Sequence, residues 1–269
     1  MKMRRLKRAL LLFFGMLAIG YLVLLITFQG HELPMDTQNL NAEHPRTIAI
    51  FGATGTIGDG LLKAAMGDPE VDKIHVITRR PSARIEEGVQ SGKVVMTIHK
   101  DYLDYAAIPE VLAEAQAVYW AIGLSAVGLD QETYREIHSD YPVEFVRAWL
   151  ASNSRQDISF HYVSGSGAGA DSRFMWAREK AAAEARLSGL ARQTNLRVVS
   201  YRPAFILPTE TEAHLGHRLM HAVLSPIGVS VAAESIGAAM LEVSDSRSGF
   251  DNGTILENKD ILVLSDAGE

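Results

Sequence analysis

The feature that most restricts the fold of this chain is a glycine-rich turn between a short apolar strand and a helix. The strand is expected at Thr47–Phe51, the turn reads Gly-Ala-Thr-Gly-Thr-Ile-Gly over 52–58, and the helix is expected at Asp59–Met66. A second apolar run, Lys73–Thr78, follows the Gly-Asp-Pro sequence that ends the helix. Strand, glycine turn, helix and second strand within about thirty residues form the βαβ unit in which dinucleotide sites are built.

Each glycine of the turn has its own physical task. Gly52 allows a tight turn out of the strand, and Gly55, which lacks a Cβ, lets the backbone approach a pyrophosphate at the positive end of the helix. Gly58 lets the helix pack closely on the strand. The spacing is G-x-x-G-x-x-G rather than G-x-G-x-x-G. It is therefore the position of the glycines between strand and helix that predicts a dinucleotide site.

The end of the second expected strand indicates which dinucleotide binds. NAD sites usually carry Asp or Glu there, which holds the ribose 2′-hydroxyl. This strand ends instead in Thr78-Arg79-Arg80-Pro81, without a carboxylate. Because a guanidinium fits a 2′-phosphate in charge and in geometry, we expect NADP(H) to be preferred, with NAD(H) as the alternative.

The rest of the chain continues the alternation of strands and helices. Further strands are expected at Val94–Ile98, Ala117–Gly123, Ile158–Val163 and Leu196–Tyr201, with helices that include Val143–Leu150 and Phe174–Ala191. This order predicts an α/β fold, a Rossmann-like doubly wound parallel sheet with its ligand at the carboxyl ends of the strands. At those ends Asp101 is placed to reach an adenine, and Gly123 lets the backbone lie against the cofactor.

Composition excludes several other classes of protein. The 269 residues are 47% hydrophobic and 22% charged, as in folded globular chains. The absence of cysteine excludes disulfides, thiolate nucleophiles and cysteine-ligated metal centres. Five of the 26 basic residues lie within the first eight positions, which leaves 21 basic against 32 acidic residues in the rest of the chain. This excess of acidic residues after position 8 argues against a surface that binds nucleic acid.

The N-terminus predicts a membrane anchor. A basic flank at 1–8 precedes 9–28, twenty residues without a charge, which as a helix would cross a bilayer core of about 30 Å. The run is longer than a usual signal-peptide core and no small-residue cleavage site follows it, so we expect a retained single-pass anchor. Residues 29–45 are interpreted as a polar linker. Residues 46–269 are interpreted as one dinucleotide-binding domain with a small C-terminal substrate lobe.

The side of the membrane on which the domain lies stays open. The basic flank favours a cytoplasmic N-terminus, with the domain on the far side. NADP(H), in contrast, is plentiful in the cytoplasm. The two arguments point in opposite directions.

From residue 46 to about 265 the chain resembles the short-chain dehydrogenase/reductase superfamily, in the atypical branch that includes Tat-interacting-protein-like oxidoreductases. The resemblance rests on GATGTIG at 52–58, the arginines at 79–80, Asp101, AIG at 121–123, VSGSGA at 163–168, REKAAAE at 178–184, YRPAFIL at 201–207 and ILENKDI at 255–261. Together with the glycine turn it implies a set of cofactor-binding residues: Gly52, Thr54, Gly55, Thr56, Ile57, Gly58, Arg79, Arg80, Asp101, Tyr102, Ala121, Ile122, Gly123, Lys180 and Pro203.

The resemblance also implies a catalytic set, of which one member is replaced. In the family a serine orients the substrate carbonyl, a tyrosine delivers the proton, and a lysine four residues on lowers the pKa of the tyrosine and holds the nicotinamide ribose. Ser166 or Ser164 matches the serine and Lys180 the lysine, but Trp176 stands at the tyrosine position. An indole N–H donates hydrogen bonds but has no acid–base role near neutral pH, so the usual proton donor is absent. The alternative for Lys180 is a solvated lysine paired with Glu184.

Two classes of function stay open on this pattern. The first is a membrane-anchored NADP(H)-dependent oxidoreductase that reduces a small or lipophilic carbonyl compound, with the proton from Ser166, water or another tyrosine. The second is a non-catalytic NADPH-sensing or scaffold protein that binds a membrane partner, which Trp176 favours. A nucleotide-sugar epimerase or dehydratase is disfavoured, because the tyrosine matters as much there.

Three histidines follow the YRPAFIL motif at 201–207. His214, His217 and His221 are spaced by three and four residues, which puts them on one face of a helix. No HExxH pattern accompanies them, so we assign no metal site and interpret them as residues of the helix surface or of the substrate lobe.

Overall fold

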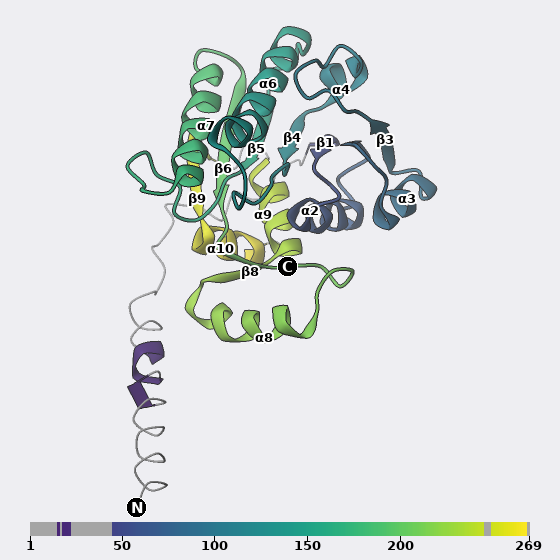
Figure 1. The fold of residues 1–269 in the computed structure, drawn as a ribbon. Helices are drawn as coiled ribbons and strands as arrows, with labels where there is room; N and C mark the ends of the chain where they lie inside the picture. The colour runs from purple at the N-terminus through teal and green to yellow at the C-terminus, as the bar shows by residue number, and fades with distance from the viewer. Residues whose placement is uncertain (1–14, 17, 23–44, 245–248, 268–269) are drawn as a thin grey trace, which may run out of the picture.

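The computed structural model describes residues 15–16, 18–22, 45–244 and 249–267 (Figure 1). In this part of the chain seven strands form one sheet in the order β3-β2-β1-β4-β5-β6-β9, and every neighbouring pair is parallel. The strands are β1 (Thr47–Phe51), β2 (Lys73–Thr78), β3 (Val94–Ile98), β4 (Ala117–Trp120), β5 (Ile158–Val163), β6 (Leu196–Arg202) and β9 (Thr254–Glu257). The Rossmann-like α/β fold is thus confirmed.

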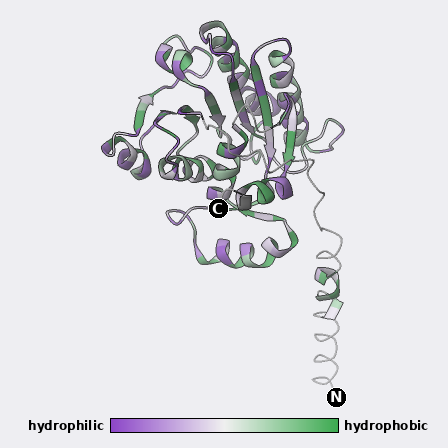
Figure 2. Ribbon diagram, turned by 180° about the vertical axis from the view of Figure 1, so that it is seen from behind, coloured by the Kyte–Doolittle hydropathy of each residue, from purple (hydrophilic) through white to green (hydrophobic). Residues whose placement is uncertain are grey.

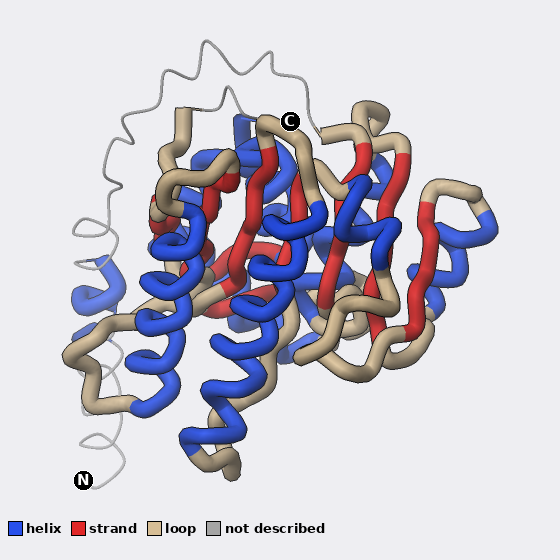
Figure 3. Tube along the Cα trace, turned by 90° about the horizontal axis from the view of Figure 1, so that it is seen from above, coloured by secondary structure: helices blue, strands red, loops and turns tan. Residues whose placement is uncertain are grey.

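Helices cover both faces of the sheet, as Figure 3 shows from above. They are α2 (Thr56–Gly67), α3 (Ala83–Gln90), α4 (Pro109–Glu114), α5 (Gln131–Arg135), α6 (Tyr141–Ser152), α7 (Met175–Ala191), α9 (Ala233–Ser244) and α10 (Asn258–Ala267). Side chains alternate across the strands because the strand period is two. Ile48 and Ile50 of β1 therefore face the core under α2, α9 and α10, whereas Ala49 and Phe51 face the core under α4, α6 and α7.

Two predicted boundaries near the glycine turn are wrong by three residues. β4 ends at Trp120 rather than Gly123, although the Ala121 N–H still donates to the Phe51 carbonyl. At Gly52, where φ is +83°, a Cβ would lie 2.6 Å from the Ala121 carbonyl carbon, so the two strand ends can approach only because that residue is glycine. The helix begins at Thr56 rather than Asp59, because the Asp59 N–H already donates to the Gly55 carbonyl.

The helix predicted around Val143–Leu150 is longer than its sequence pattern indicated. α5 runs through a π turn, η2 (Glu136–Asp140), directly into α6. Pro142 has no N–H to donate to the carbonyl four residues back, that of His138. The Tyr162 hydroxyl donates to this carbonyl instead, at 2.6 Å, and ties the helical run to the end of β5.

A small lobe lies below the sheet in Figure 1. It contains the parallel pair β7 (Phe205–Leu207) and β8 (Ser230–Ala232), with α8 (Leu215–Leu224) and the 3₁₀ turn η3 (Ser225–Ile227) between them. In Figure 2 hydrophobic and hydrophilic residues alternate along α8, which lies apart from the layers that cover the sheet.

The predicted membrane segment falls largely outside the described residues, as do the basic flank and the linker up to residue 44. Among the residues that are described, no helix combines the length and the apolar character needed to cross a bilayer. Residues 18–22 are helical, and the Tyr21 hydroxyl donates to the Val223 carbonyl of α8 at 2.9 Å.

Candidate functional site

A cavity of about 310 Å³ lies at the carboxyl ends of β1, β2, β3 and β4. Nine of the residues predicted to hold the cofactor line it: Gly52, Thr54, Gly55, Arg79, Arg80, Tyr102, Ala121, Ile122 and Gly123. Six further residues complete the lining: Ile77, Thr78, Lys100, Leu124, Ile137 and Tyr141. The structure thus brings together the glycine turn, the end of β2 and the end of β4, which is where a doubly wound sheet binds its ligand.

The glycine turn leaves the start of α2 open to this cavity. Gly55 is the N-cap of α2 and no side chain caps its first N–H groups, so they are available to an anion. A Cβ at Gly58 would lie 2.1 Å from the Gly52 carbonyl oxygen, so only glycine allows the turn and the helix to pack this closely. Thr56, Ile57 and Gly58 belong to the first turn of α2 and support the turn rather than line the cavity.

The cavity is lined by cations. Arg79, Arg80 and Lys100 contribute to its wall, and among the described residues that line it there is no Asp or Glu. Thr78 fixes the turn that presents the arginines, since its hydroxyl donates to the Arg80 carbonyl at 2.7 Å. Sequence reasoning missed Lys100, although its place directly after a strand end was a usable signal.

Asp101 has a different position from its neighbours Lys100 and Tyr102. Its carboxylate accepts a hydrogen bond from the Leu103 N–H at 3.0 Å, and it does not line the cavity. Here Asp101 stabilises a turn, and its predicted contact with an adenine stays a prediction. The buried Tyr102 ring stacks on Tyr141 at a centroid distance of 5.5 Å, and burial raises the pKa of Tyr102 while the nearby charge of Arg79 opposes that shift.

His138 is a functional neighbour that sequence reasoning did not single out. Its ring lies under Gly123, where a Cβ would come within 3.1 Å of Cε1, and its Nε2 is 3.2 Å from the Leu124 N–H. Burial is the main cause that lowers the pKa of His138 to about 3, and the charge of Lys180 contributes less. His138 is therefore neutral at physiological pH and holds the 122–124 backbone in place.

The two candidate serines differ in a way that the sequence did not indicate. Ser164 is buried, its N–H donates to the Tyr201 carbonyl at 2.8 Å, and its hydroxyl has no hydrogen-bond partner among the described residues. Ser166 is exposed, and its N–H donates to the Pro203 carbonyl at 3.0 Å. A buried hydroxyl without a partner is unfavourable unless a ligand completes it, so the geometry favours Ser164 over Ser166 as the group that meets a substrate.

Lys180 is buried beside Ser164, and the alternative of a solvated pair with Glu184 is wrong. Its ammonium donates to the carbonyl of Val163 at 2.8 Å and lies 4.8 Å from the centroid of the Tyr162 ring. The Glu184 carboxylate instead accepts two hydrogen bonds from Arg202, at 2.6 and 2.9 Å. Burial lowers the pKa of Lys180 to about 7, and the charge of Glu184 opposes this shift.

Trp176 lies against the loop that carries both serines. Atoms of its six-membered ring would be 3.6 Å from a Cβ at Gly165 and 3.8 Å from one at Gly167. The position that the resemblance gives to tyrosine is therefore next to the serine loop and one helical turn from Lys180. The residue found there cannot exchange a proton.

A carboxylate from the small lobe reaches the glycine turn. The Thr56 hydroxyl donates to Glu212 at 3.1 Å, and on the same loop Thr209 donates to Asp59 of α2. Glu210 pairs with Lys63 and Arg84. The lobe is thus attached to α2, with the Glu212 charge beside the helix end that would receive a pyrophosphate.

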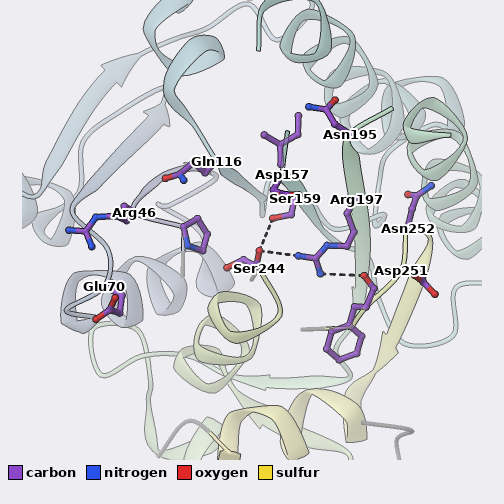
Figure 4. Close-up of a pocket in the computed structure, with 13 residues that line it drawn as sticks. Arg46, Glu70, Gln116, Asp157, Ser159, Asn195, Arg197, Ser244, Asp251 and Asn252 are labelled. Carbon is purple, nitrogen blue, oxygen red and sulfur yellow. Dashed lines mark hydrogen bonds between the residues drawn. The ribbon is translucent and has the colours of Figure 1, made fainter. Parts of the chain in front are cut away.

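A larger cavity of about 650 Å³ lies at the opposite, amino end of the strands (Figure 4). Its most buried cation, Arg197, donates to the carbonyls of Val243 and Ser244 at 2.9 and 3.0 Å. Arg46 at its rim pairs with Asp72. These groups are engaged in holding the fold, so we place the functional site at the other end of the sheet.

The three histidines do not gather around a common point. His214 caps α8 through its Nδ1, which accepts from the His217 N–H, and His221 Nδ1 lies 2.7 Å from the Ser230 hydroxyl. The described residues contain no group of three or more His, Asp or Glu side chains arranged to hold a metal ion.

Known proteins match this chain at low sequence identity. A scan against protein-family models found no match. Leucinostatins biosynthesis cluster protein T of Purpureocillium lilacinum is 30% identical over 121 residues, 44% of this chain and 42% of that protein. Protein FMP52, mitochondrial, of Saccharomyces cerevisiae is 26% identical over 234 residues, 80% of this chain and 95% of that protein. The chain therefore spans less than half the length of the first relative, and matches only 3% of a hybrid PKS-NRPS synthetase of Penicillium oxalicum.

Solved structures define the class of fold. An oxidoreductase of the short-chain dehydrogenase/reductase family from Burkholderia thailandensis has a TM-score of 0.62 at 18% identity, over 81% of this chain and 93% of that chain. The 3-oxoacyl-(acyl-carrier protein) reductase of Brucella melitensis, solved with NAD, has a TM-score of 0.63 at 20% identity, over 82% and 98%. The fold is that of short-chain dehydrogenases/reductases, which confirms the resemblance at the level of architecture.

Proposed function

We propose that this chain is a membrane-anchored, atypical short-chain dehydrogenase/reductase that binds NADP(H) and reduces the carbonyl group of a small or lipophilic compound. One observation carries the proposal: a cation-lined cavity lies over the glycine turn, and His138 under its Gly123 wall is within electrostatic reach of the buried amine of Lys180. Lys180 in turn donates to the Val163 carbonyl, next to the buried Ser164 hydroxyl that has no partner among the described residues. The relatives that share the fold include reductases and dehydrogenases, which supports the reaction class.

The charges at the cavity support NADP(H) over NAD(H). The Brucella reductase was solved with NAD, so the fold by itself does not select NADP(H) and the choice depends on side chains. In this chain Arg79, Arg80 and Lys100 line the cavity, and no lining carboxylate among the described residues is available for a ribose 2′-hydroxyl. A 2′-phosphate would meet charge-assisted hydrogen bonds there.

The residues fit a reduction in which the usual tyrosine is dispensable. Bound NADPH would supply the hydride to the carbonyl carbon. The Ser164 hydroxyl donates a hydrogen bond to the carbonyl oxygen and orients it. Lys180, whose pKa is lowered to about 7, holds a proton at Nζ at the end of the same strand and gives it to that oxygen. The amine is then reprotonated from solvent.

The anchor is the part of the proposal that depends on sequence alone. Twenty uncharged residues at 9–28 after a basic flank support a single membrane-spanning helix. With such an anchor, a lipophilic substrate would be available close to the domain.

Calorimetric titration of the full-length protein with NADPH and NADH, followed by NADPH oxidation with a panel of aldehydes and ketones, tests the proposal. We expect tighter binding of NADPH, and turnover that Ser164→Ala lowers by about 10²-fold while Ser166→Ala changes it less than twofold. Equal affinities for the two cofactors would overturn the NADP(H) assignment. Tight NADPH binding without turnover would instead support the second candidate, a non-catalytic NADPH-binding protein, which Trp176 favours.

A further inference from the structure

Helix α8 exposes an apolar stripe that no other described element covers. None of its residues is buried. Leu215, Leu219 and Val223 recur every fourth residue, so they lie on one face, and Met220 widens that face. These four side chains are between 47% and 72% exposed. A contiguous apolar face of this kind on a folded domain indicates a contact with a partner or a membrane.

The charges of α8 indicate the chemistry of its partner. From 214 to 224 the chain has one arginine, Arg218, three histidines and no acidic residue. Two copies of the chain that met stripe to stripe would bring two Arg218 side chains together, which is unfavourable. An anionic lipid surface, in contrast, complements both the charge of Arg218 and the apolar stripe.

A second exposed apolar surface lies beside α8. The Tyr21 hydroxyl donates to the Val223 carbonyl, which places the helical residues 18–22 at the C-terminal end of α8. Among the described N-terminal residues, Met16, Ile19 and Leu22 are exposed. Two neighbouring elements thus present apolar side chains that the described domain leaves uncovered.

We propose that α8 is an interfacial helix that lies on an anionic lipid bilayer, with Leu215, Leu219 and Val223 among the acyl chains and Arg218 at the headgroups. This inference rests on the membrane anchor of the proposed function. An interfacial α8 also suggests a route for the substrate. The loop just before α8 carries Glu212, which contacts Thr56 at the start of α2, so the helix on the bilayer is connected to the candidate site. A lipophilic carbonyl compound would then reach the site from the bilayer rather than through water.

The absence of cysteine from the chain makes a clean test available. Full-length protein carrying Leu219→Cys is labelled with the fluorophore NBD and reconstituted into phosphatidylcholine vesicles with or without phosphatidylserine, which supplies the negative surface charge. We expect blue-shifted emission that spin-labelled lipids quench by half or more, and weaker quenching without phosphatidylserine. Arg218→Glu in the labelled protein should also weaken the quenching, as removal of phosphatidylserine does.

Two control positions make the outcome decisive. Val89→Cys on α3, exposed to a similar degree, should show neither the shift nor the quenching, and Ile19→Cys reports on the anchor. Quenching at 19 but not at 219 would overturn the inference about α8 and leave the anchor intact. Quenching at neither position would overturn the anchor as well. A shift at 219 that grows with protein concentration and resists lipid quenchers would assign the stripe to a second copy of the chain and overturn the inference. Unchanged NADPH affinity establishes that each labelled variant is folded.

Discussion

The two halves of the candidate site are built in different ways. The half at β1, β2 and β4 consists of a glycine turn, main-chain N–H groups and exposed cations. The half at β5 and α7 consists of buried side chains, Ser164 and Lys180, with a tryptophan where the family pattern has tyrosine. The first half needs only a backbone shape and positive charge, whereas the second depends on the chemistry of single atoms. A chain can therefore keep cofactor binding while its catalytic chemistry changes.

Replacing Lys180 gives the largest expected effect, because it removes the proton source of the second half. Lys180→Met should lower kcat by about 10²–10⁴-fold, the usual contribution of general acid catalysis. In the unsubstituted protein kcat should fall as pH rises through about 7, since the protonated amine, present below its pKa, is the active form. The measurement is NADPH oxidation from pH 5.5 to 9.

Lys93→Met is the matched control for this substitution. Lys93 also donates to backbone carbonyls, those of Met66 and Asp68, but at the amino end of the sheet. Its replacement should leave both kcat and the pH profile unchanged. If Lys180→Met kept the same pH profile, the proton would have another source.

A tyrosine at position 176 should restore the missing proton donor. In Trp176→Tyr the phenol stands one helical turn before Lys180, whose ammonium lowers the pKa of the phenol. We expect kcat/KM for a suitable ketone to rise by about 10–10²-fold, with NADPH affinity unchanged. Because the indole packs on Gly165 and Gly167, the smaller ring leaves space rather than a clash.

Trp176→Phe separates the hydroxyl from the change in size. It creates nearly the same space and should not accelerate turnover. A slower Trp176→Tyr variant would show that the tryptophan itself contributes to the native reaction. Absence of turnover in all three forms, with NADPH still bound, would favour the non-catalytic candidate.

Substitution of an arginine tests the first half by itself. Arg79→Glu should reduce the preference for NADPH over NADH by about 10–10²-fold, since a charge-assisted hydrogen bond contributes about 1.5–3 kcal/mol. NADH affinity should change much less, because NAD has no 2′-phosphate. The two dissociation constants are measured by calorimetry, with Arg155→Glu, an exposed arginine near the amino end of β5, as the control. Equal loss for both cofactors would place Arg79 at the pyrophosphate instead.

The sequence predicted the first half better than the second for a physical reason. The strands β1, β2, β3 and β5 begin and end where their apolar runs do, and the glycine turn lies within one βαβ unit, so local pattern was enough. The choice between Ser164 and Ser166 depends on which hydroxyl is buried without a partner, which only packing determines. The burial of Lys180 and its bond to Val163 likewise join segments 17 residues apart.

Contacts between distant segments were beyond the reach of sequence patterns. His138 lies under Gly123 on the π turn η2 (Glu136–Asp140), and no sequence period marks such a turn. Glu212 is 156 residues from Thr56 in the chain, yet their side chains are hydrogen-bonded. Asp101 accepts a hydrogen bond within its own turn, and its predicted contact with an adenine stays a prediction.

Substitution of Glu212, which links the first half of the site to the small lobe, gives the smallest expected effect. Its carboxylate lies beside the start of α2, where the negative pyrophosphate would bind, so the two like charges compete for the same helix end. Glu212→Gln keeps the size of the side chain and an oxygen that accepts from Thr56, but removes the charge. NADPH affinity should rise about two- to fivefold, as expected for 0.3–1 kcal/mol at a helix terminus.

The control for this substitution is Glu234→Gln, which removes the same charge where it pairs with Lys63, two turns further along α2. Its effect on NADPH affinity should be smaller, and higher ionic strength should reduce the gain of Glu212→Gln because salt screens exposed charges. Weaker NADPH binding by Glu212→Gln would show that the Glu212 carboxylate holds the glycine turn in its binding shape rather than opposing the pyrophosphate. In that case the small lobe would help to build the first half of the site, which would then include a residue from outside the strand ends and the glycine turn.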